Sequence, residues 1–417
     1  MNKTLTPSPS PAPIKSTPRL ELKSYSENQD YLAQGKTEPS SRSQTLIYYA
    51  EDTSKRWWIK VTLLGTIANI LDNAEIQHAS KRQRRAVYQS FVRQISYDSL
   101  PLLPDTVTEI ILEGGTEAAG GDMVFELADT TGTMKTLNNS LRYRVQEDPL
   151  RVVYPLCDEF PYFQKINNEQ LIRDTEITDG VFWVYHNEIR YVLKIVNRPL
   201  YEPRDTDVFR KELENLEYFA GVPNIVQAAG VAVSTNPYVT SSGRDGPLVV
   251  TGILFEAYSG GSLRQILLES CIAEYPWKQW PVQIGTALNR FHVAKKTHMD
   301  IKPSNIVIDS EGNAVVIDIS GIGGITRQWC SPEIQQDETS PFDLPFEQRR
   351  LNDVWTYGKL LSDISSHAGD DPFASTLKQV ADCLMKKNWE TRMSLTKAIS
   401  RLKGAENWTN RCTSYST

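Results

Sequence analysis

The chain has 417 residues, of which 40% are hydrophobic and 23% are charged, so it can bury a sizeable core in two domains or in one large bilobal domain. Its net charge of −6 argues against nucleic acid or an anionic membrane as a partner. Five cysteines without C-x-x-C spacing argue against a zinc site or a disulfide framework. No signal-peptide pattern and no membrane-length apolar run is recognisable, so we expect a cytoplasmic protein that is not secreted.

Residues 1–45 have the composition of a disordered tail. They are rich in Pro, Ser, Thr, Lys and Gln, and prolines at 7, 9, 11 and 13 alternate with small residues. Such a segment buries too little apolar surface to offset the entropy that is lost on ordering. We therefore predict no fixed structure before residue 46.

Residues 46–165 are predicted to form a small α/β region of no recognisable family. Apolar residues at helical spacing run across Ala86–Ile95. The basic run at 81–85 has two interpretations, the exposed start of that helix, which is favoured, or a nuclear-import signal, which keeps a nuclear location open. Whether the region is a separate domain or an extension of the next one is open. Three segments have the composition of short strands: Leu46–Ala50, Trp57–Val61 and Val107–Leu112.

From about residue 168 to 405 the pattern is that of an α+β protein with two lobes, because strands come first and helices dominate after about residue 262. Val181–Tyr185 and Ile189–Ile195 flank a short turn and predict a β-hairpin. Lys194 lies in the second of these strands among apolar neighbours. A lysine at such a position is costly unless a counter-charge meets it.

The most informative motif is the loop Thr-His-Met-Asp-Ile-Lys-Pro-Ser-Asn at 297–305, followed by Asp318 after an apolar run. Phosphoryl transfer to a hydroxyl requires these residue types. One carboxylate takes or orients the hydroxyl proton, and a lysine steadies the phosphoryl group. An asparagine and a second carboxylate hold the metal ions that neutralise the phosphates.

These residues resemble the catalytic loop and the metal-binding loop of protein kinases. Lys302, two residues after Asp300, is the serine/threonine form of that loop, and the chain is also similar to atypical fungal kinase-like proteins. The resemblance implies a bilobal kinase fold over 166–405, with an N-lobe at 166–256 and a C-lobe at 257–405. A tail is then expected at 406–417.

The resemblance also implies roles for individual residues. Asp300 would be the general base, Lys302 would contact the γ-phosphate, and Asn305 and Asp318 would hold Mg²⁺. On the ATP side the implied set is Lys194, Glu212 (with Glu214 as the alternative), Gly180, Phe255, Glu256 and Tyr258. Four further residues would be structural: His298 and Asp353 at the catalytic loop, and the expected pair Glu333 and Arg392.

The chain departs from the family pattern in four respects. The phosphate-covering loop keeps only Gly180, and Asp318-Ile319-Ser320 stands where the family has Asp-Phe-Gly. Met299 replaces the arginine that grips an activation-segment phosphate in many kinases, which makes this a non-RD form. The segment from Asp318 to Glu333 is also short, because Glu333 follows Asp318 by only 15 positions. Activity is therefore not expected to depend on phosphorylation of this segment, for example at Thr326.

The leading interpretation is an ATP- and Mg²⁺-dependent serine/threonine protein kinase that acts on a protein substrate. A pseudokinase scaffold is the alternative, and the glycine-poor loop favours it. Retention of Lys194, Asp300, Asn305 and Asp318 opposes it, because a protein without turnover has no need for all four. A small-molecule phosphotransferase is the third interpretation. Lys302 and the Ser331-Pro332-Glu333 motif favour a protein kinase over that class.

Overall fold

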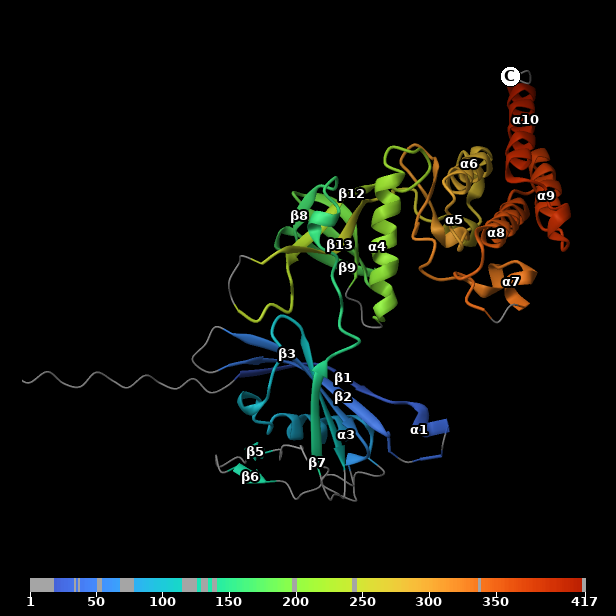
Figure 1. Ribbon diagram of the computed structural model, residues 1–417. Coiled ribbons are helices and arrows are strands. Elements are labelled where there is room, and N and C mark those ends of the chain that lie inside the picture. The colour runs from blue at the N-terminus through green and yellow to red at the C-terminus, as the bar shows by residue number, and fades with distance from the viewer. Residues whose placement is uncertain are drawn as a thin grey trace, which may run out of the picture. The chain divides into compact units, whose positions relative to one another are not determined.

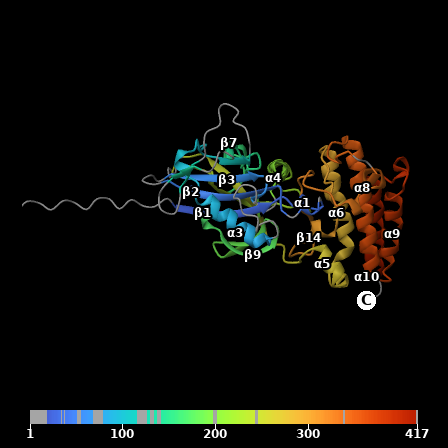
Figure 2. The same cartoon turned by 90° about the horizontal axis from the view of Figure 1, so that it is seen from below.

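A computed structural model describes residues 19–33, 35–36, 38–50, 55–67, 79–114, 126–128, 134–136, 141–196, 201–241, 246–336 and 339–414. The chain divides into two compact units (Figures 1 and 2). Unit 1 comprises 1–151 together with 235–247, and unit 2 comprises 152–234 and 248–417. No helix among these described residues has the length and apolarity required to cross a membrane.

Unit 1 is built on a five-stranded sheet in the order β1-β2-β3-β4-β7. Strands β3 and β4 pair in parallel, and the other three neighbouring pairs are antiparallel. The chain connects β3 to β4 through helix α3, as a parallel pair requires a crossover. The main elements are β1 (Arg19–Glu27), β2 (Ser41–Tyr49), β3 (Arg56–Leu64), α3 (Lys81–Val92), β4 (Val107–Gly114) and β7 (Leu141–Glu147), with α1 (Asp30–Ala33), β5 (Glu126–Ala128) and β6 (Met134–Thr136) as short additions.

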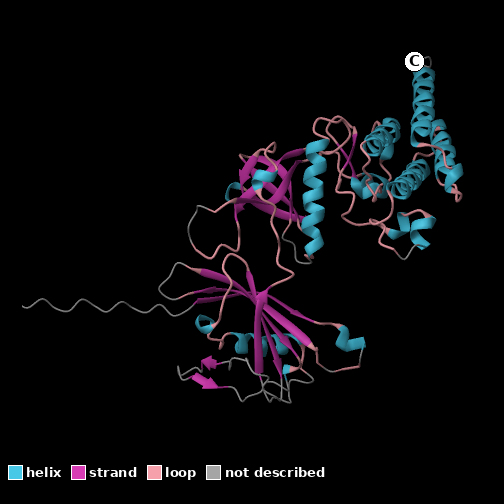
Figure 3. Cartoon of the chain, viewed as in Figure 1, coloured by secondary structure: helices cyan, strands magenta, loops and turns pink. Residues whose placement is uncertain are grey.

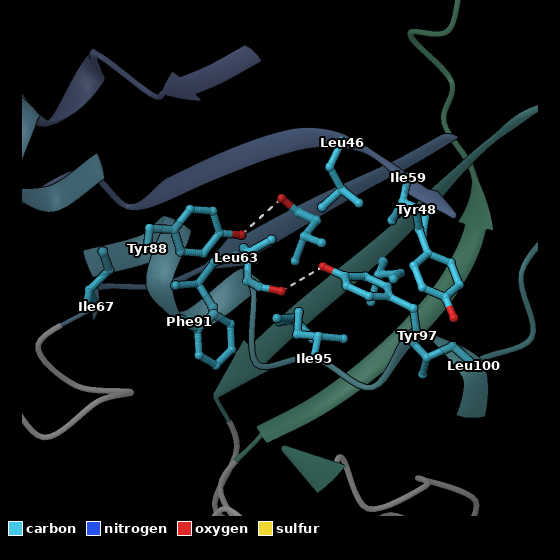
Figure 4. Close-up of a cluster of buried hydrophobic side chains, with 14 residues drawn as sticks. Leu46, Tyr48, Ile59, Leu63, Ile67, Tyr88, Phe91, Ile95, Tyr97 and Leu100 are labelled. Carbon is cyan, nitrogen blue, oxygen red and sulfur yellow. Dashed lines mark hydrogen bonds between the residues drawn. The ribbon is translucent and has the colours of Figure 1, made fainter. Parts of the chain in front are cut away.

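The core of unit 1 forms where alternate strand residues meet one face of α3 (Figure 4). Ile59, Val61 and Leu63 share one face of β3 because strand side chains alternate, and all three are buried. Tyr88 and Phe91 on α3 pack against them. The Tyr88 hydroxyl donates to the Val61 carbonyl at 3.0 Å, so the buried polar tip of this ring has a partner.

The expectation of a disordered tail through residue 45 is wrong for the described part of that segment. Strand β1 pairs with β2, and it ends at Glu27, whose carboxylate accepts from Arg84 Nε at 3.0 Å and Nη2 at 2.9 Å. Both side chains are nearly inaccessible to solvent. The basic run at 81–85 begins helix α3, as favoured, but Arg84 points inward to this pair. Residues 1–18 lie outside the described residues.

Unit 2 has the bilobal α+β fold expected from the sequence, with a sheet-rich first lobe and a helical second lobe (Figure 3). The six-stranded sheet has the order β8-β12-β13-β11-β10-β9, and helix α4 (Pro203–Tyr218) belongs to the same lobe. The predicted hairpin is present as β10 and β11. The strands are β8 (Lys165–Asn167), β9 (Ile172–Thr178), β10 (Val181–His186), β11 (Ile189–Ile195), β12 (Ala228–Thr235) and β13 (Leu248–Glu256).

The second lobe is a helical assembly with one two-stranded sheet, β14 paired with β15. Helix α8 contacts α9 and α6, and α10 contacts α9 and α6. The elements are α5 (Leu263–Leu268), α6 (Trp280–Val293), β14 (Ile306–Ile308), β15 (Ala314–Val316), α7 (Pro332–Gln336), α8 (Phe346–His367), α9 (Pro372–Leu384) and α10 (Leu395–Ser414). The tail expected at 406–417 is helical through Ser414, and 415–417 lie beyond the described part of the chain.

The unit boundaries differ from the sequence boundaries in two respects. Unit 2 begins at Val152, ahead of the expected start at 166, and the bridge between Leu156 and Val249 ties this stretch to β13. The loop at 235–247, which joins β12 to β13, belongs to unit 1. There Asp105 exchanges two hydrogen bonds with Thr240, and Trp58 Nε1 donates to the Pro237 carbonyl at 2.9 Å.

We expect Glu27→Gln to lower the free energy of unfolding of unit 1 by about 2 kcal/mol at pH 7, because it leaves the buried Arg84 guanidinium without a counter-charge. Burial alone would raise the pKa of Glu27, but the hydrogen bonds from Arg84 and Tyr25 outweigh burial and lower it. The stability that this carboxylate contributes is therefore complete above its ordinary pKa of 4.5 and is lost as the pH falls through the lowered folded value.

Chemical denaturation at several pH values would measure this difference. The gap between wild type and Glu27→Gln should shrink on acidification below pH 4.5. Lys23→Met removes the exposed Lys23–Glu21 pair and serves as the control, with an expected change below about 1 kcal/mol. A gap that stays constant with pH would contradict the assignment to Glu27.

Candidate active site

Lys194 links three elements of unit 2 through one ammonium group. Its Nζ lies 2.6 Å from Glu212 Oε2 on α4 and 2.8 Å from Asp318 Oδ1, just after β15. The structure therefore selects Glu212, since Glu214 pairs with Lys211 on the surface of the helix. The Glu212 side chain is 1% exposed whereas that of Asp318 is 41% exposed, so only Asp318 is open to a dissolved ion.

Helix α4 presents Glu212 to Lys194 for reasons that are visible in its sequence. Pro203 stands in the first turn, where its missing N–H costs nothing, and Asp205 accepts from the Glu202 N–H at 2.9 Å. Leu213 and Leu216 bury the apolar face of the helix. Glu212 lies on the margin of that face and is drawn inward by the lysine.

The charges in this triad shift one another. Burial lowers the pKa of Lys194, but the charges of Asp318 and Glu212 outweigh burial and raise it. Burial raises the pKa of Glu212, and Lys194 offsets only part of that effect. The Lys194 ammonium lowers the pKa of Asp318 to about 2. Asp318 is thus a carboxylate, a form that binds cations, across the neutral range.

The loop at 297–305 gathers Asp300, Lys302 and Asn305 into one hydrogen-bonded group. Lys302 Nζ donates to Asp300 Oδ2 at 2.6 Å, and Asn305 Nδ2 donates to Asp300 Oδ2 at 3.1 Å and to the Asp300 carbonyl at 2.8 Å. Because the amide nitrogen of Asn305 is used in this way, its side-chain oxygen is the atom left to bind a cation.

Thr326 is a member of this group that sequence reasoning considered only as a phosphorylation site. Its N–H donates to Asp300 Oδ1 at 3.0 Å, and its hydroxyl accepts from Lys302 Nζ at 2.8 Å. A Thr326→Ala variant would therefore disturb the site itself and could not isolate an effect of phosphorylation. The signal in the sequence was its position shortly before Ser331-Pro332-Glu333, in the segment that must pass the catalytic loop.

Asp353 anchors the catalytic loop from the interior. Its side chain is fully buried on α8, and it accepts from the His298 N–H at 2.9 Å, the Met299 N–H at 2.8 Å and His292 Nε2 at 3.0 Å. Met299 has a positive φ of 70°, a backbone conformation that residues other than glycine rarely adopt. The carboxylate thus holds a turn that would not form on its own.

His298 is a neutral spacer in this arrangement. Its Nε2 contacts the Ile317 carbonyl at 2.9 Å, and a carbonyl only accepts, so the proton lies on Nε2. Its Nδ1 then accepts from the Asp300 N–H at 3.3 Å. The ring connects the catalytic loop to the strand that leads into Asp318, which is a structural role.

Glu333 and Arg392 form the expected pair at the end of the segment. Arg392 Nη1 and Nη2 donate to the two carboxylate oxygens at 2.5 and 2.9 Å. The Arg392 side chain is 1% exposed, so this forked contact fixes Ser331-Pro332-Glu333 to the helical lobe.

Gly180 is the residue that the structure does not present to the site as expected. It occupies a tight turn between β9 and β10, with φ of 73°, and its N–H donates to Glu176 Oε1 at 3.1 Å. An amide held by a carboxylate on its own loop is not available to a phosphate oxygen. Glu176 is a residue whose contact the sequence did not signal.

The strand β13 leads into the connection between the lobes. Phe255 is nearly buried opposite Val192, and Glu256 ends the strand opposite Tyr191. Tyr258 follows, and its carbonyl accepts from the Gly261 N–H at 3.4 Å. Gly260 must lack a side chain because a Cβ there would lie 2.7 Å from Ile308 Cβ. The connection therefore packs directly on β14, next to the catalytic loop.

Two oxygen ligands are present for a divalent cation, the Asp318 carboxylate and the Asn305 amide oxygen. No cluster of three or more His, Cys, Asp and Glu side chains suited to a metal occurs in the part of the chain that is described. This donor set fits Mg²⁺, which is often held by one or two carboxylates together with substrate phosphates, and it does not fit zinc.

Comparison with known proteins agrees with this geometry. Residues 180–401 match the family described as protein kinase domain. Sperm motility kinase Z of Mus musculus is 26% identical over 166 residues, covering 36% of this chain and 31% of that protein. Serine/threonine-protein kinase Sgk1-B of Xenopus laevis is 26% identical over 161 residues, covering 36% and 35%. Serine/threonine-protein kinase SBK1 of Danio rerio is 29% identical over 164 residues, covering 37% and 39%. The chain thus spans well under two thirds of the length of these relatives.

We expect Asp353→Asn to lower the free energy of unfolding of unit 2 by about 2 kcal/mol, because an amide turns one donor toward the two buried N–H groups and leaves one of them unpaired. Thermal and chemical unfolding would measure the change. Glu347→Gln, at the exposed start of the same helix, is the matched control and should change stability by less than about 0.5 kcal/mol. Equal stability of wild type and Asp353→Asn would show that the carboxylate does not anchor the loop.

Proposed function

The chain belongs to the protein kinase family, because the family match covers residues 180–401, more than half of its 417 residues, and on this premise we propose that it is an ATP- and Mg²⁺-dependent serine/threonine protein kinase. The reaction transfers the γ-phosphoryl group of ATP to a hydroxyl of a protein substrate. The hydroxyl oxygen forms the new bond to phosphorus, the bond to the leaving ADP oxygen breaks, and the hydroxyl proton passes to a base.

The observation that carries this proposal is the position of the Lys194 ammonium between Glu212 and Asp318. Hydrogen bonds to Glu212 and Asp318 fix the position of the Lys194 ammonium. The ammonium can therefore donate to nucleotide phosphates that bind beside the exposed Asp318 carboxylate. A chain without phosphoryl-transfer activity would gain more stability from apolar residues in place of the whole triad.

Asp300 is proposed as the general base. Its Oδ2 accepts from Lys302 and Asn305, and its Oδ1 accepts from Thr326. These contacts fix the carboxylate, so that an incoming hydroxyl meets an oriented acceptor for its proton. Lys302, in contact with both Asp300 and Thr326, places a positive charge where the transferred group gains negative charge.

Asp318 and Asn305 would hold Mg²⁺, through the carboxylate and the amide oxygen. When bound, the ion neutralises the phosphate oxygens and orients the nucleotide. Asp318 is suited to this task because Lys194 keeps it ionised while 41% of its side chain stays accessible.

A protein acceptor is supported by a hollow between the end of the segment from Asp318 to Glu333 and helix α8. Its volume is about 460 Å³, and its lining includes Trp329, Trp355, Lys359 and Asp363. Trp329 is three residues beyond Thr326, which contacts Asp300 and Lys302. A polypeptide with its hydroxyl at Asp300 would have neighbouring residues within reach of this hollow. The names of the relatives, as protein kinases, point to the same substrate class.

We expect Asp300→Asn to lower phosphoryl transfer by about a thousandfold, because the amide accepts no proton, while Mg²⁺-ATP binding is retained. Transfer of labelled phosphate from ATP to a generic basic protein would be measured beside Mg²⁺-ATP binding by calorimetry. Glu214→Ala, on the exposed face of α4, is the control and should behave as wild type. Equal transfer by wild type and Asp300→Asn would refute the assignment of the base.

A scaffold without turnover is the second candidate, and the contact between Glu176 and the Gly180 N–H favours it. A carboxylate on the phosphate-covering loop would repel a nucleotide. Wild-type protein that binds Mg²⁺-ATP but transfers no phosphate would select this function. Glu176→Gln would then be expected to raise ATP affinity, as it removes the negative charge and keeps the acceptor.

Independence from activation-segment phosphorylation is supported by the packing of the segment. Met299 is buried in an apolar cluster with Cys330 and Ile334, and it stands where an arginine could otherwise pair with a phosphate. Of the three hydroxyl side chains between Asp318 and Glu333, Ser320 and Ser331 are buried and Thr326 is bonded to Lys302.

Protein treated with a phosphatase should therefore keep the transfer rate of untreated protein to within a factor of about two, because no phosphate contributes to the fold of this segment. The rate before and after treatment, with intact mass to verify the absence of phosphate, is the measurement. A large loss of rate that returns on rephosphorylation would contradict the proposal.

A further inference from the structure

Asn215 is a buried polar residue on the apolar face of α4, and no role is assigned to it by the reaction described so far. It is 2% exposed and lies one helical turn beyond Glu212, next to Leu216. Its Nδ2 donates to the Ile319 carbonyl at 2.6 Å and contacts the Ser320 carbonyl at 3.4 Å. These carbonyls belong to the two residues that directly follow Asp318.

Lys296 fixes which way this amide faces. Its Nζ donates to Asn215 Oδ1 at 2.6 Å, so the amide oxygen must point to the ammonium and the NH₂ group to the two carbonyls. Lys296 stands over the Tyr218 ring at 5.1 Å and lies just ahead of the loop at 297–305. The hydrogen bonds from Lys296 to Asn215 and from Asn215 to the Ile319 carbonyl therefore connect the catalytic loop, helix α4 and the metal-binding turn.

The turn at Asp318 needs such support. Asp318 has φ of 61°, in the left-handed region that costs energy for a residue with a side chain, and it is held there only by its surroundings. Gly321 has φ of 72°, and a Cβ at that position would lie 2.3 Å from the Thr297 carbonyl, so the following bend is closely packed. The Ser320 hydroxyl accepts from the Gly323 N–H at 2.9 Å, which closes the bend.

We propose that Asn215 and Lys296 are positioning residues that hold Asp318 in the conformation that binds the divalent cation, while Glu212 on the same helix face holds Lys194. The inference rests on the proposed kinase function and adds to it a second contact between α4 and the metal-binding turn. Glu212 fixes the position of Lys194, and Asn215 fixes the backbone that carries the Asp318 carboxylate. Displacement of α4 would break both contacts together.

The test compares nucleotide binding with and without metal. Asn215→Leu keeps the volume of the side chain and removes both hydrogen-bonding atoms, and Lys296→Met removes the group that orients the amide. We expect the Mg²⁺-dependent gain in ATP affinity to fall about tenfold in Asn215→Leu and about threefold in Lys296→Met. ATP affinity in the presence of EDTA should stay within a factor of two of wild type, since Lys194 remains in place.

Further variants separate positioning from general damage. The double variant should be no weaker than Asn215→Leu alone, because Lys296 acts through the amide. Lys296→Arg should retain wild-type Mg²⁺-ATP binding, because the arginine still donates a hydrogen bond to Asn215 Oδ1. Glu214→Ala, which lies next to Asn215 in sequence but on the exposed face, is the matched control with no expected change. Thermal unfolding of each variant verifies folding, and Lys296→Met, at a half-exposed site, stays informative if Asn215→Leu does not fold.

Two outcomes would overturn the inference. Loss of metal-dependent and metal-free binding in equal proportion would mean that the network only stabilises the fold. Unchanged Mg²⁺ dependence in both variants would mean that Asp318 is positioned without it. Wild-type protein that binds no Mg²⁺-ATP would instead refute the kinase function and this inference with it, whereas failure of the variants alone leaves the kinase function intact.

Discussion

The contact on which the active site depends is the ammonium of Lys194 between two carboxylates. A buried lysine or glutamate alone is strongly unfavourable, so Lys194 and Glu212 require each other, and Asp318 adds a second carboxylate to the lysine. They come from β11, from α4 and from the turn after β15, and their hydrogen bonds hold these three elements together. The two carboxylates differ in solvent exposure. Glu212 is buried and has a structural role, whereas Asp318 is partly exposed and accessible to a ligand.

A second constraint is the way in which the segment from Asp318 to Glu333 is held. Hydrogen bonds from Asn215, Arg204 and Thr326, and the ion pair of Glu333 with Arg392, retain it along its length. Most of these contacts involve uncharged groups or backbone carbonyls that are present in the chain as synthesised. None of these contacts requires a phosphate group.

Much of the geometry at the candidate active site could be predicted because the residues involved are adjacent in sequence or are separated by regular spacing. The loop at 297–305 forms one hydrogen-bonded group, and the hairpin around Lys194 follows from local alternation. What could not be predicted rests on contacts between distant segments. The choice between Glu212 and Glu214 depended on the position of Lys194, a residue of another element, which pairs with Glu212. Thr326 and Asn215 acquire their roles only when the fold brings them to Asp300 and to the turn after Asp318.

The error at the N-terminus has the same origin. The composition of residues 19–45 resembles that of a disordered segment, since it is polar and contains few large apolar side chains. Strand β1 forms because its backbone pairs with β2 and because Glu27 meets Arg84, far along the chain. A polar segment can thus be ordered by one buried ion pair and by pairing with the edge of a neighbouring strand. Neither contact can be recognised from composition.

The assignment of the loop at 235–247 to unit 1 has a consequence for how this protein can be divided. The chain passes between the units at three places, at 151/152, 234/235 and 247/248, so neither unit is a continuous stretch of sequence. Cutting the chain once near residue 151 would separate Tyr238 from Trp58 and Thr240 from Asp105, which are their partners in unit 1. A gene fragment that encodes residues 152–417 therefore carries residues 235–247 of unit 1 within it.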